Sequence, residues 1–177
     1  MSLSAKFDDD VCRHLNRRAT SFKWTTQKRV GETTGERVDI AGQAEPRVGR
    51  RPLPKVFVEA ELRREDPVSN VLKVWSEFMR QGCKDEIIFF QGFSRVYRSR
   101  KYSNRGIKAR CAQEFGKMME KHTDESIRYV PIRMRYLPVS GKHEGNGARH
   151  DAAVRFANRI IASLREMKVP LSPQNSR

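Results

Sequence analysis

Polar and apolar positions alternate most clearly in residues 55–63, which have the sequence KVFVEAELR. An alternation with a period of two is typical of a β-strand. One face of this strand is apolar throughout, and the other carries Phe57, Glu59 and Glu61. The pattern therefore predicts a strand that places two carboxylates side by side on one face.

A different period follows in residues 67–81, where Val71, Val74, Trp75 and Phe78 recur at intervals of three and four. This spacing places the four side chains on one face of an α-helix. An aspartate and a proline stand immediately before the pattern, as is common where a helix begins. The segment therefore predicts an amphipathic helix.

The same criteria predict elements along the whole chain in the order α-β-β-β-α-β-α-β-α. Helices are expected at residues 8–20, 67–81, 105–122 and 148–167. Strands are expected at residues 22–30, 36–42, 55–63, 85–93 and 126–137. This order predicts an α/β fold with a mixed central β-sheet flanked by helices.

Three local features add to this prediction. Asp8–Asp10 are expected in the first turn of the first helix, where the helix dipole favours negative charge. Pro131 lacks an N–H group and predicts that the last strand either lies at an edge of the sheet or contains a bulge. Residues 168–177 are expected to form a frayed tail.

Length and composition limit the class of protein. The 177 residues suit a single domain. No run of about 20 apolar residues is present, which excludes a membrane-spanning protein. The first residues lack the apolar segment of a signal peptide, and three widely spaced cysteines match no zinc or disulfide pattern. We therefore expect a cytoplasmic protein.

The charge balance indicates a polyanionic partner. Lys and Arg number 36 against 21 Asp and Glu, which gives a net charge of +15 spread along the whole chain. Arginine outnumbers lysine, and its guanidinium group suits bidentate contact with phosphate. Nucleic acid is the expected partner because neutralised phosphates release their counterions. Charge for solubility and an acidic protein partner are the alternatives.

A third carboxylate adds to the pair on the predicted strand. Asp39 stands between two apolar residues of the preceding strand, so its side chain leaves the face opposite theirs. If the two strands pair, Asp39, Glu59 and Glu61 converge at one end of the sheet. Such a cluster repels itself unless a cation neutralises it, and hard oxygen ligands suit Mg²⁺. The alternative is a solvated strand face whose charges pair with nearby Lys and Arg side chains.

The segments Val38-Asp39-Ile40 and Val58-Glu59-Ala60-Glu61, on the second and third predicted strands, resemble the motif of the PD-(D/E)XK restriction-endonuclease-like nucleases. The resemblance covers a core of residues 8–93, with a helix-strand-helix extension over residues 94–167. The chain departs from the motif twice. Val38 stands where the motif has proline, and Glu61 stands where it usually has lysine, although some restriction enzymes carry glutamate there.

The resemblance implies a metal-dependent nuclease that hydrolyses phosphodiester bonds in DNA, and restriction or defence enzymes are the class it suggests. Asp39 and Glu59 would hold Mg²⁺ or Mn²⁺, with the Ala60 carbonyl completing the set. Glu61 would hold a second metal ion or orient the attacking water, a task for which the family uses lysine. Lysine's absence puts the identity of the base in doubt.

Two further polar residues lie near this cluster in the predicted fold. Gln91 stands among apolar residues of the fourth strand, and it either points at the site or satisfies a neighbouring backbone group. Glu36, like Glu32, brackets the first hairpin and either supplies another carboxylate or is solvated in the turn.

Cations gather in two predicted loops, where they either meet phosphate or are simply solvated. In the second loop they interleave with aromatic residues, a mixture that suits backbone contact and stacking on exposed bases. The residues concerned are Arg47, Arg50, Arg51, Arg95, Tyr97, Arg98, Arg100, Lys101 and Tyr102. In the last strand, Arg133 and Arg135 share one face and extend the basic surface.

We therefore expect a DNA endonuclease, and we expect a homodimer on duplex DNA because so short a chain has no separate specificity domain. The first alternative is a nucleic-acid-binding module of the same fold with a degenerate site. The second is a basic structural or ribosome-associated protein, in which Asp39 and Glu59 would lie too far apart to share an ion.

Overall fold

The computed structural model describes residues 2–30, 36–44, 52–62, 66–80, 86–98, 103–136 and 146–172. Within them, the α-helices are α1 (Leu3–Arg18), α2 (Val68–Arg80), α3 (Ser103–His122) and α4 (Asn146–Glu166). The strands are β1 (Phe22–Arg29), β2 (Arg37–Ala44), β3 (Lys55–Glu61), β4 (Ile87–Phe93) and β5 (Ile127–Arg133). A short 3₁₀ helix, η1, covers Arg95–Arg98. The predicted order of helices and strands is confirmed.

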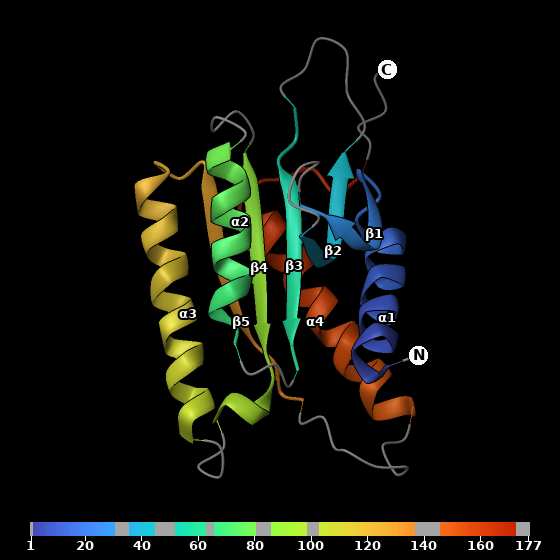
Figure 1. The fold of residues 1–177 in the computed structure, drawn as a ribbon. Helices are drawn as coiled ribbons and strands as arrows, with labels where there is room; N and C mark the ends of the chain where they lie inside the picture. The colour runs from blue at the N-terminus through green and yellow to red at the C-terminus, as the bar shows by residue number, and fades with distance from the viewer. Residues whose placement is uncertain are drawn as a thin grey trace, which may run out of the picture.

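The strands form a five-stranded mixed sheet in the order β1-β2-β3-β4-β5. β1, β2 and β3 are antiparallel, whereas β3, β4 and β5 are parallel. Parallel neighbours end at the same edge of a sheet, so β3, β4 and β5 have their carboxyl ends together, at the lower end in Figure 1. The predicted α/β fold with a mixed central sheet flanked by helices is confirmed.

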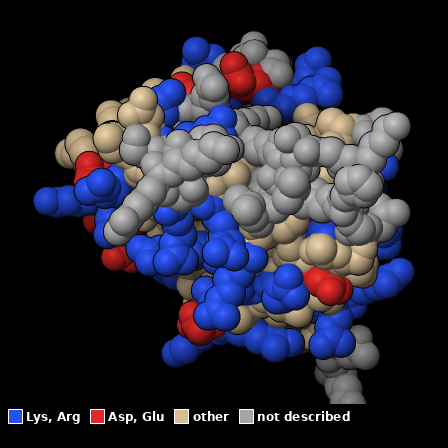
Figure 2. Space-filling model, turned by 90° about the horizontal axis from the view of Figure 1, so that it is seen from below, with Lys and Arg blue, Asp and Glu red and all other residues tan. Residues whose placement is uncertain are grey.

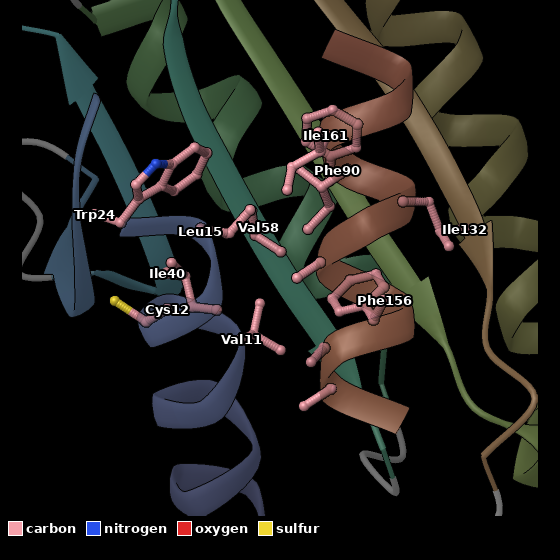
Figure 3. Close-up of a cluster of buried hydrophobic side chains, with 14 of the residues drawn as sticks. Val11, Cys12, Leu15, Trp24, Ile40, Val58, Phe90, Ile132, Phe156 and Ile161 are labelled. Carbon is pink, nitrogen blue, oxygen red and sulfur yellow. The ribbon is translucent and has the colours of Figure 1, made fainter. Parts of the chain in front are cut away.

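Helices cover both faces of the sheet (Figure 1). On one face, side chains from α1 and α4 pack with Ile40, Val58 and Phe90 of the sheet (Figure 3). On the other face, side chains from α2 and α3 pack with Phe57 and Phe89. Each face of the sheet therefore has its own apolar core.

The two-residue period of β3 sorts its side chains between these cores as predicted. The even-numbered positions from Val56 to Leu62 join the α1–α4 core, whereas Phe57 joins the α2–α3 core. Glu59 and Glu61 therefore lie on the α2–α3 side, beneath helices rather than in solvent. The alternative of a solvated carboxylate face is excluded for these two residues.

The first helix differs from its predicted bounds because it begins at Leu3 rather than at residue 8. The Ser2 hydroxyl caps it by accepting a hydrogen bond from the Ala5 N–H at 3.2 Å. The three aspartates thus lie within the helix rather than in its first turn. Asp10 forms ion pairs with Arg13 at 3.0 Å and with Arg149 of α4 at 3.2 Å. Asp10 therefore links α1 to α4, a role that the helix dipole alone did not predict.

The last strand occupies an edge position, one of the two alternatives that Pro131 predicted. In the described part of the chain, β5 pairs with β4 and with no second strand. The side chain of Pro131 is exposed. No helix of the described residues is long and apolar enough to cross a membrane.

Gly92 of β4 lies directly against the ring of Phe156 from α4. A methyl group at this position would lie 2.6 Å from two carbon atoms of the Phe156 ring. Gly92→Ala should therefore lower the free energy of unfolding by about 1–3 kcal/mol, the usual cost of overpacking a core. The measurement is urea denaturation followed by circular dichroism.

Gly147→Ala is the matched control, since a methyl group there meets no atom within 4 Å. This variant should be as stable as the wild type or more stable, because alanine favours a helix over glycine by about 1 kcal/mol. Equal stability of the Gly92→Ala variant and the wild type would contradict the packing described.

Candidate functional site

Where the backbone pairing of β2 with β3 stops, the side chain of Asp39 links the two strands. The two strands pair from Gly42 and Val56 as far as Ile40 and Val58. One residue further along, the Asp39 side chain accepts a hydrogen bond at Oδ2 from the Ala60 N–H at 2.9 Å. This bond fixes the carboxylate of Asp39 against the peptide that joins Glu59 to Ala60.

β1 changes conformation opposite Asp39. The β1–β2 register runs from Thr26 with Ile40 to Lys28 with Val38, which leaves Gln27 opposite Asp39. Gln27 has a φ of 52°, in the left-handed region that non-glycine residues seldom adopt. The regular sheet is therefore interrupted on both sides of Asp39.

Glu59 lies next to this bond and has a cationic partner from α2. Its side chain has 0% exposure, and it forms an ion pair with the Lys73 ammonium group. The same ammonium donates a hydrogen bond to the Arg37 carbonyl at 2.6 Å. Lys73 therefore ties α2 to both β2 and β3.

The surroundings of Glu59 disfavour its ionised form. Its pKa is raised well above the ordinary value of 4.5, first by burial and then by the charge of Asp39. Lys73 lowers the pKa and Glu61 raises it, but burial is the largest cause. The charges of Asp39 and Glu61 therefore both act on Glu59.

Glu61 is held by two amide groups. Its Oε1 accepts hydrogen bonds from Asn70 Nδ2 at 2.5 Å and from Gln91 Nε2 at 2.7 Å. Its side chain has no exposed surface. These bonds connect β3 to α2 and to β4, so Glu61 has a positioning role in the fold whatever its part in chemistry.

Gln91 extends the network across the sheet. Its Nε2 also donates to the Pro67 carbonyl at 2.8 Å, and its Oε1 accepts a hydrogen bond from the Tyr129 hydroxyl at 2.7 Å. Both sequence-based alternatives for Gln91 are therefore met, since it contacts the carboxylate cluster and satisfies a backbone carbonyl. The pKa of Tyr129 is raised by its burial and by Glu61.

The network lies where the parallel strands end. Glu59 is in register with Gln91, and Glu61 with Phe93, the last residue of β4. The Pro67 carbonyl that Gln91 binds stands just before α2 begins. Carboxyl ends of parallel strands are the usual place for ligands in α/β sheets. Figure 2 views the molecule from this end, and Lys and Arg side chains gather on the part not drawn in grey.

The expected metal ligands agree in chemistry with a hard cation. Asp39 and Glu59 offer carboxylate oxygens, and the Ala60 carbonyl, which accepts the Leu62 N–H at 2.8 Å, offers a backbone oxygen. The described residues contain no group of three or more His, Cys, Asp or Glu placed to hold a metal ion. The expected set consists of two carboxylate residues, Asp39 and Glu59, and one backbone carbonyl.

The expected nucleic-acid contacts divide into two groups. Arg95 and Arg98 are exposed on η1, where they are available to phosphate. Tyr97 corrects the prediction of a base-stacking residue: it is 4% exposed and packs edge-on against Phe93, with ring centroids 5.7 Å apart. The 3₁₀ turn directs its ring into the α2–α3 core rather than outward.

Other expected residues lie at the surface or outside the described residues. Glu36 is exposed, which favours its solvated alternative. Glu32 and the remaining expected contacts fall outside the described residues. Those contacts are Arg47, Arg50, Arg51, Arg100, Lys101 and Tyr102.

Sequence reasoning missed three residues of the network, namely Asn70, Lys73 and Tyr129. Asn70 adjoins the apolar stripe of α2, and a polar residue at the rim of such a stripe is a signal that could have been used. Lys73 follows Asn70 by three residues and lies on the same side of the helix. Tyr129 carried no signal, because an aromatic residue in a strand is usually packed in a core.

The raised pKa of Glu59 predicts a pH dependence of stability. Above about pH 4.5 the unfolded chain loses the Glu59 proton while the folded chain retains it. The free energy of unfolding therefore falls as the pH rises towards the folded-state pKa. Glu59→Gln should remove this fall, so that its stability relative to the wild type increases from about pH 4.5 upward.

Urea denaturation of both proteins from about pH 4 to about pH 8 measures this effect. Glu166→Gln, which changes an exposed carboxylate at the end of α4, is the control and should follow the wild type. If the free energy of unfolding changed with pH in the same way for Glu59→Gln and the wild type, the raised pKa of Glu59 would be contradicted.

The Lys73–Glu59 pair predicts a second stability effect. Lys73→Met keeps the aliphatic chain but removes the ammonium group that lowers the pKa of Glu59, so the loss of stability with rising pH should become larger and extend to higher pH, up to about 3–5 kcal/mol once Glu59 is ionised without its cation. Adding Glu59→Gln to Lys73→Met should recover most of this loss, because the uncompensated charge is then absent. A double-mutant cycle by urea denaturation tests the coupling, with Lys108→Met on the exposed side of α3 as control. Additive changes in the free energy of unfolding would contradict the coupling of Lys73 with Glu59.

Comparison with protein-family models found no matching family, and searches of curated proteins and of solved structures found no match. The resemblance to restriction-endonuclease-like nucleases therefore stays a prediction from residues 38–40 and 58–61 and their strands. The function is inferred from the chain's own residues, above all from the buried cluster that Asp39, Glu59, Glu61 and Lys73 form.

Proposed function

We propose that the protein is a metal-dependent nuclease of restriction-endonuclease-like fold that hydrolyses phosphodiester bonds in DNA. The observation that carries the proposal is the hydrogen bond from the Ala60 N–H to Asp39 Oδ2, which holds the Asp39 carboxylate beside Glu59. Two acidic side chains on paired strands, next to a backbone carbonyl, are a donor set for Mg²⁺ or Mn²⁺.

The electrostatics of Glu59 support a cation at this place. Burial and the charge of Asp39 both raise the pKa of Glu59, so a cation shared by the two carboxylates would be bound favourably. Asp39, Glu59 and the Ala60 carbonyl would hold it. A bound divalent ion would supply activation of water and stabilisation of charge that develops on phosphate.

Lys73 would take the place of the lysine that the motif lacks at position 61. Its ammonium group already contacts Glu59, although it comes from α2 rather than from β3. Released from Glu59, the ammonium group would donate to a phosphate oxygen or hold the attacking water. Glu61, fixed by Asn70 and Gln91, would keep β3 and α2 aligned.

The proposed mechanism requires that a metal ion can reach the buried carboxylates. Glu59 has 0% exposure and Asp39 6%, whereas the Lys73 side chain reaches the surface with 9%. Movement of the Lys73 side chain away from Glu59 would both free a carboxylate for the metal ion and open a path to it. The long aliphatic chain of lysine allows such a movement without a shift of the backbone.

The net charge of +15 supports a polynucleotide substrate. Arg95 and Arg98 stand on η1, directly after β4, where they would contact the phosphate backbone beside the cluster. We retain a homodimer as part of the proposal, because two copies of so short a chain would be needed to cut both strands of a duplex.

A second candidate is a nucleic-acid-binding module that does not cleave. The Lys73–Glu59 pair favours it, since an internal ammonium group already serves as the cation that the carboxylates need. In this function the carboxylate cluster would only stabilise the fold, and the basic surface alone would bind the nucleic acid.

Cleavage of circular plasmid DNA distinguishes the two candidates. With Mg²⁺ or Mn²⁺ the wild type should nick or linearise the plasmid, whereas Asp39→Asn and Glu59→Gln should reduce the rate by at least about 100-fold. Binding of DNA in the presence of EDTA should remain within about threefold of the wild type for both variants, since phosphate contacts lie elsewhere.

Asp151→Asn, which removes an exposed carboxylate of α4, is the charge-matched control and should cleave at the wild-type rate. Salt-sensitive binding without metal-dependent cleavage of plasmid, linear duplex or single strands would overturn the nuclease and support the binding module.

A further inference from the structure

Exposed apolar side chains gather on two neighbouring helices. A single exposed apolar residue is normal on a protein surface, but a contiguous group of them is typical of an interaction site. Among the described residues, every large apolar side chain that is exposed belongs to α2 or α3. We call this group the α2–α3 patch. It consists of Leu72, Met79, Ile107, Phe115 and Met118, with exposed fractions from 36% to 58%.

On α2, the patch lies on the side that faces α3. Lys73 marks the other side of the helix, because its ammonium group binds the Arg37 carbonyl of β2. Trp75 stands about 200° further round the helix and packs, partly buried, against the α2–α3 core. Leu72 and Met79 lie one turn before and one turn after Trp75. On this side of α2 lies α3, which contacts both α2 and β5 (Figure 1).

On α3, the patch forms part of a continuous apolar stripe. Intervals of three and four residues place its members along one side of the helix. The stripe consists of Ile107, Cys111, Phe115 and Met118. The opposite side of α3 is marked by Gly116, where a methyl group would lie 2.4 Å from the Tyr129 ring of β5. The stripe therefore faces away from the sheet, beside the exposed apolar side chains of α2.

The outer side of α2 is poor in charge for so highly charged a chain. Charged residues make up 32% of the sequence. The exposed positions of α2 before Arg80 are nevertheless Ser69, Leu72, Ser76 and Met79. The outer sides of α1 and α4, in contrast, expose only charged, polar or small residues in the described part of the chain. Depletion of charge together with large apolar side chains is typical of the core of a protein–protein interface.

The size of the face formed by α2 and α3 suits a second copy of the chain. Helices of 13 and 20 residues, each about 10 Å wide, present a projected area of about 500 Å². Two copies that meet through this face bury about 1,000 Å², the size from which specific interfaces are found. An isologous contact places patch against patch, so apolar side chains meet apolar side chains. Arg110, Lys117 and Lys121 lie beside the stripe of α3, where they would remain solvated.

We propose that the protein forms a two-fold symmetric dimer in which the α2–α3 patch of one copy packs on the α2–α3 patch of the other. The proposal deepens the homodimer of the proposed function, and it rests on that function for the choice of a second copy as the occupant. A two-fold axis along the helices would leave the carboxyl ends of β3, β4 and β5 of both copies at one end of the dimer. One duplex would then reach both carboxylate clusters.

Sedimentation equilibrium in EDTA, without nucleic acid, tests the interface. The wild type should associate with a Kd of about 100 μM or tighter, and a wild type that stays monomeric at about 1 mM would overturn the proposal. Met79→Gln combined with Met118→Gln should raise the Kd at least about 100-fold, because two-fold symmetry removes four apolar side chains from the contact. Glutamine is close to methionine in length and helix propensity, and both positions are exposed, so the fold should remain intact.

Ala148→Gln combined with Ala162→Gln is the matched control, because it places two glutamines at exposed positions of α4. Its Kd should stay within about threefold of the wild-type value, since these positions lie far from the patch. Equal loss of association in the two double variants would overturn the patch as the interface. The dimer should also persist when NaCl rises from about 0.1 to about 0.5 M, because salt does not screen apolar contacts. Dissociation over this range would likewise overturn the proposal.

A membrane surface is the other occupant that an apolar patch beside basic residues would accept. Flotation with vesicles of phosphatidylcholine and phosphatidylserine tests it. A monomeric protein that binds these vesicles, and loses the binding in the double variant of Met79 and Met118, would overturn the second copy as the occupant.

The interface and the nuclease fail in different measurements. Dimerisation that depends on Met79 and Met118, without cleavage of any DNA, would support the interface and overturn the nuclease. Metal-dependent cleavage by a protein that stays monomeric would overturn the interface and leave the nuclease standing. If both proposals hold, Met79→Gln with Met118→Gln should still nick circular plasmid but linearise it at least about tenfold more slowly than the wild type, because a single copy holds one carboxylate cluster.

Discussion

Burial of carboxylates on β3 is the constraint on which the arrangement of the α2 side depends. Glu59 and Glu61 have no exposed surface, and a buried carboxylate is costly unless donors or cations surround it. Glu61 receives two amide donors, and Glu59 receives the Lys73 ammonium group. Because α2 supplies Asn70 as well as Lys73, the position of this helix on the sheet follows from the needs of the two glutamates.

The same constraint explains why the end of β3 is polar on one side alone. The alternate positions of β3 join an apolar core beneath α1 and α4, which needs no hydrogen bonds from side chains. On the other side the network continues from Glu61 through Gln91 to Tyr129 and so crosses β3, β4 and β5. A polar network that spans three strands within an otherwise apolar layer reduces stability unless it is fully satisfied.

The parallel half of the sheet brings the carboxylate cluster and a basic surface to one end of the molecule. β3, β4 and β5 all finish there, so residues after each strand meet although they are far apart in sequence. The carboxylate cluster lies on the α2–α3 face at this end. Basic side chains gather on the described part of the surface at this end (Figure 2).

The sequence by itself determined the order of elements, the two faces of β3, the apolar stripe of α2 and the choice between an edge and a bulge for β5, because each follows from local periodicity or from the missing N–H of Pro131. It did not determine that Lys73 meets Glu59, that Gln91 meets Tyr129, or that the ring of Tyr97 turns into the core. Those contacts join residues that are far apart in the chain or depend on how a short turn directs one side chain. Only the packing of α2 and η1 against the completed sheet decides them, since hydrogen bonds and burial are properties of the neighbours a residue acquires on folding.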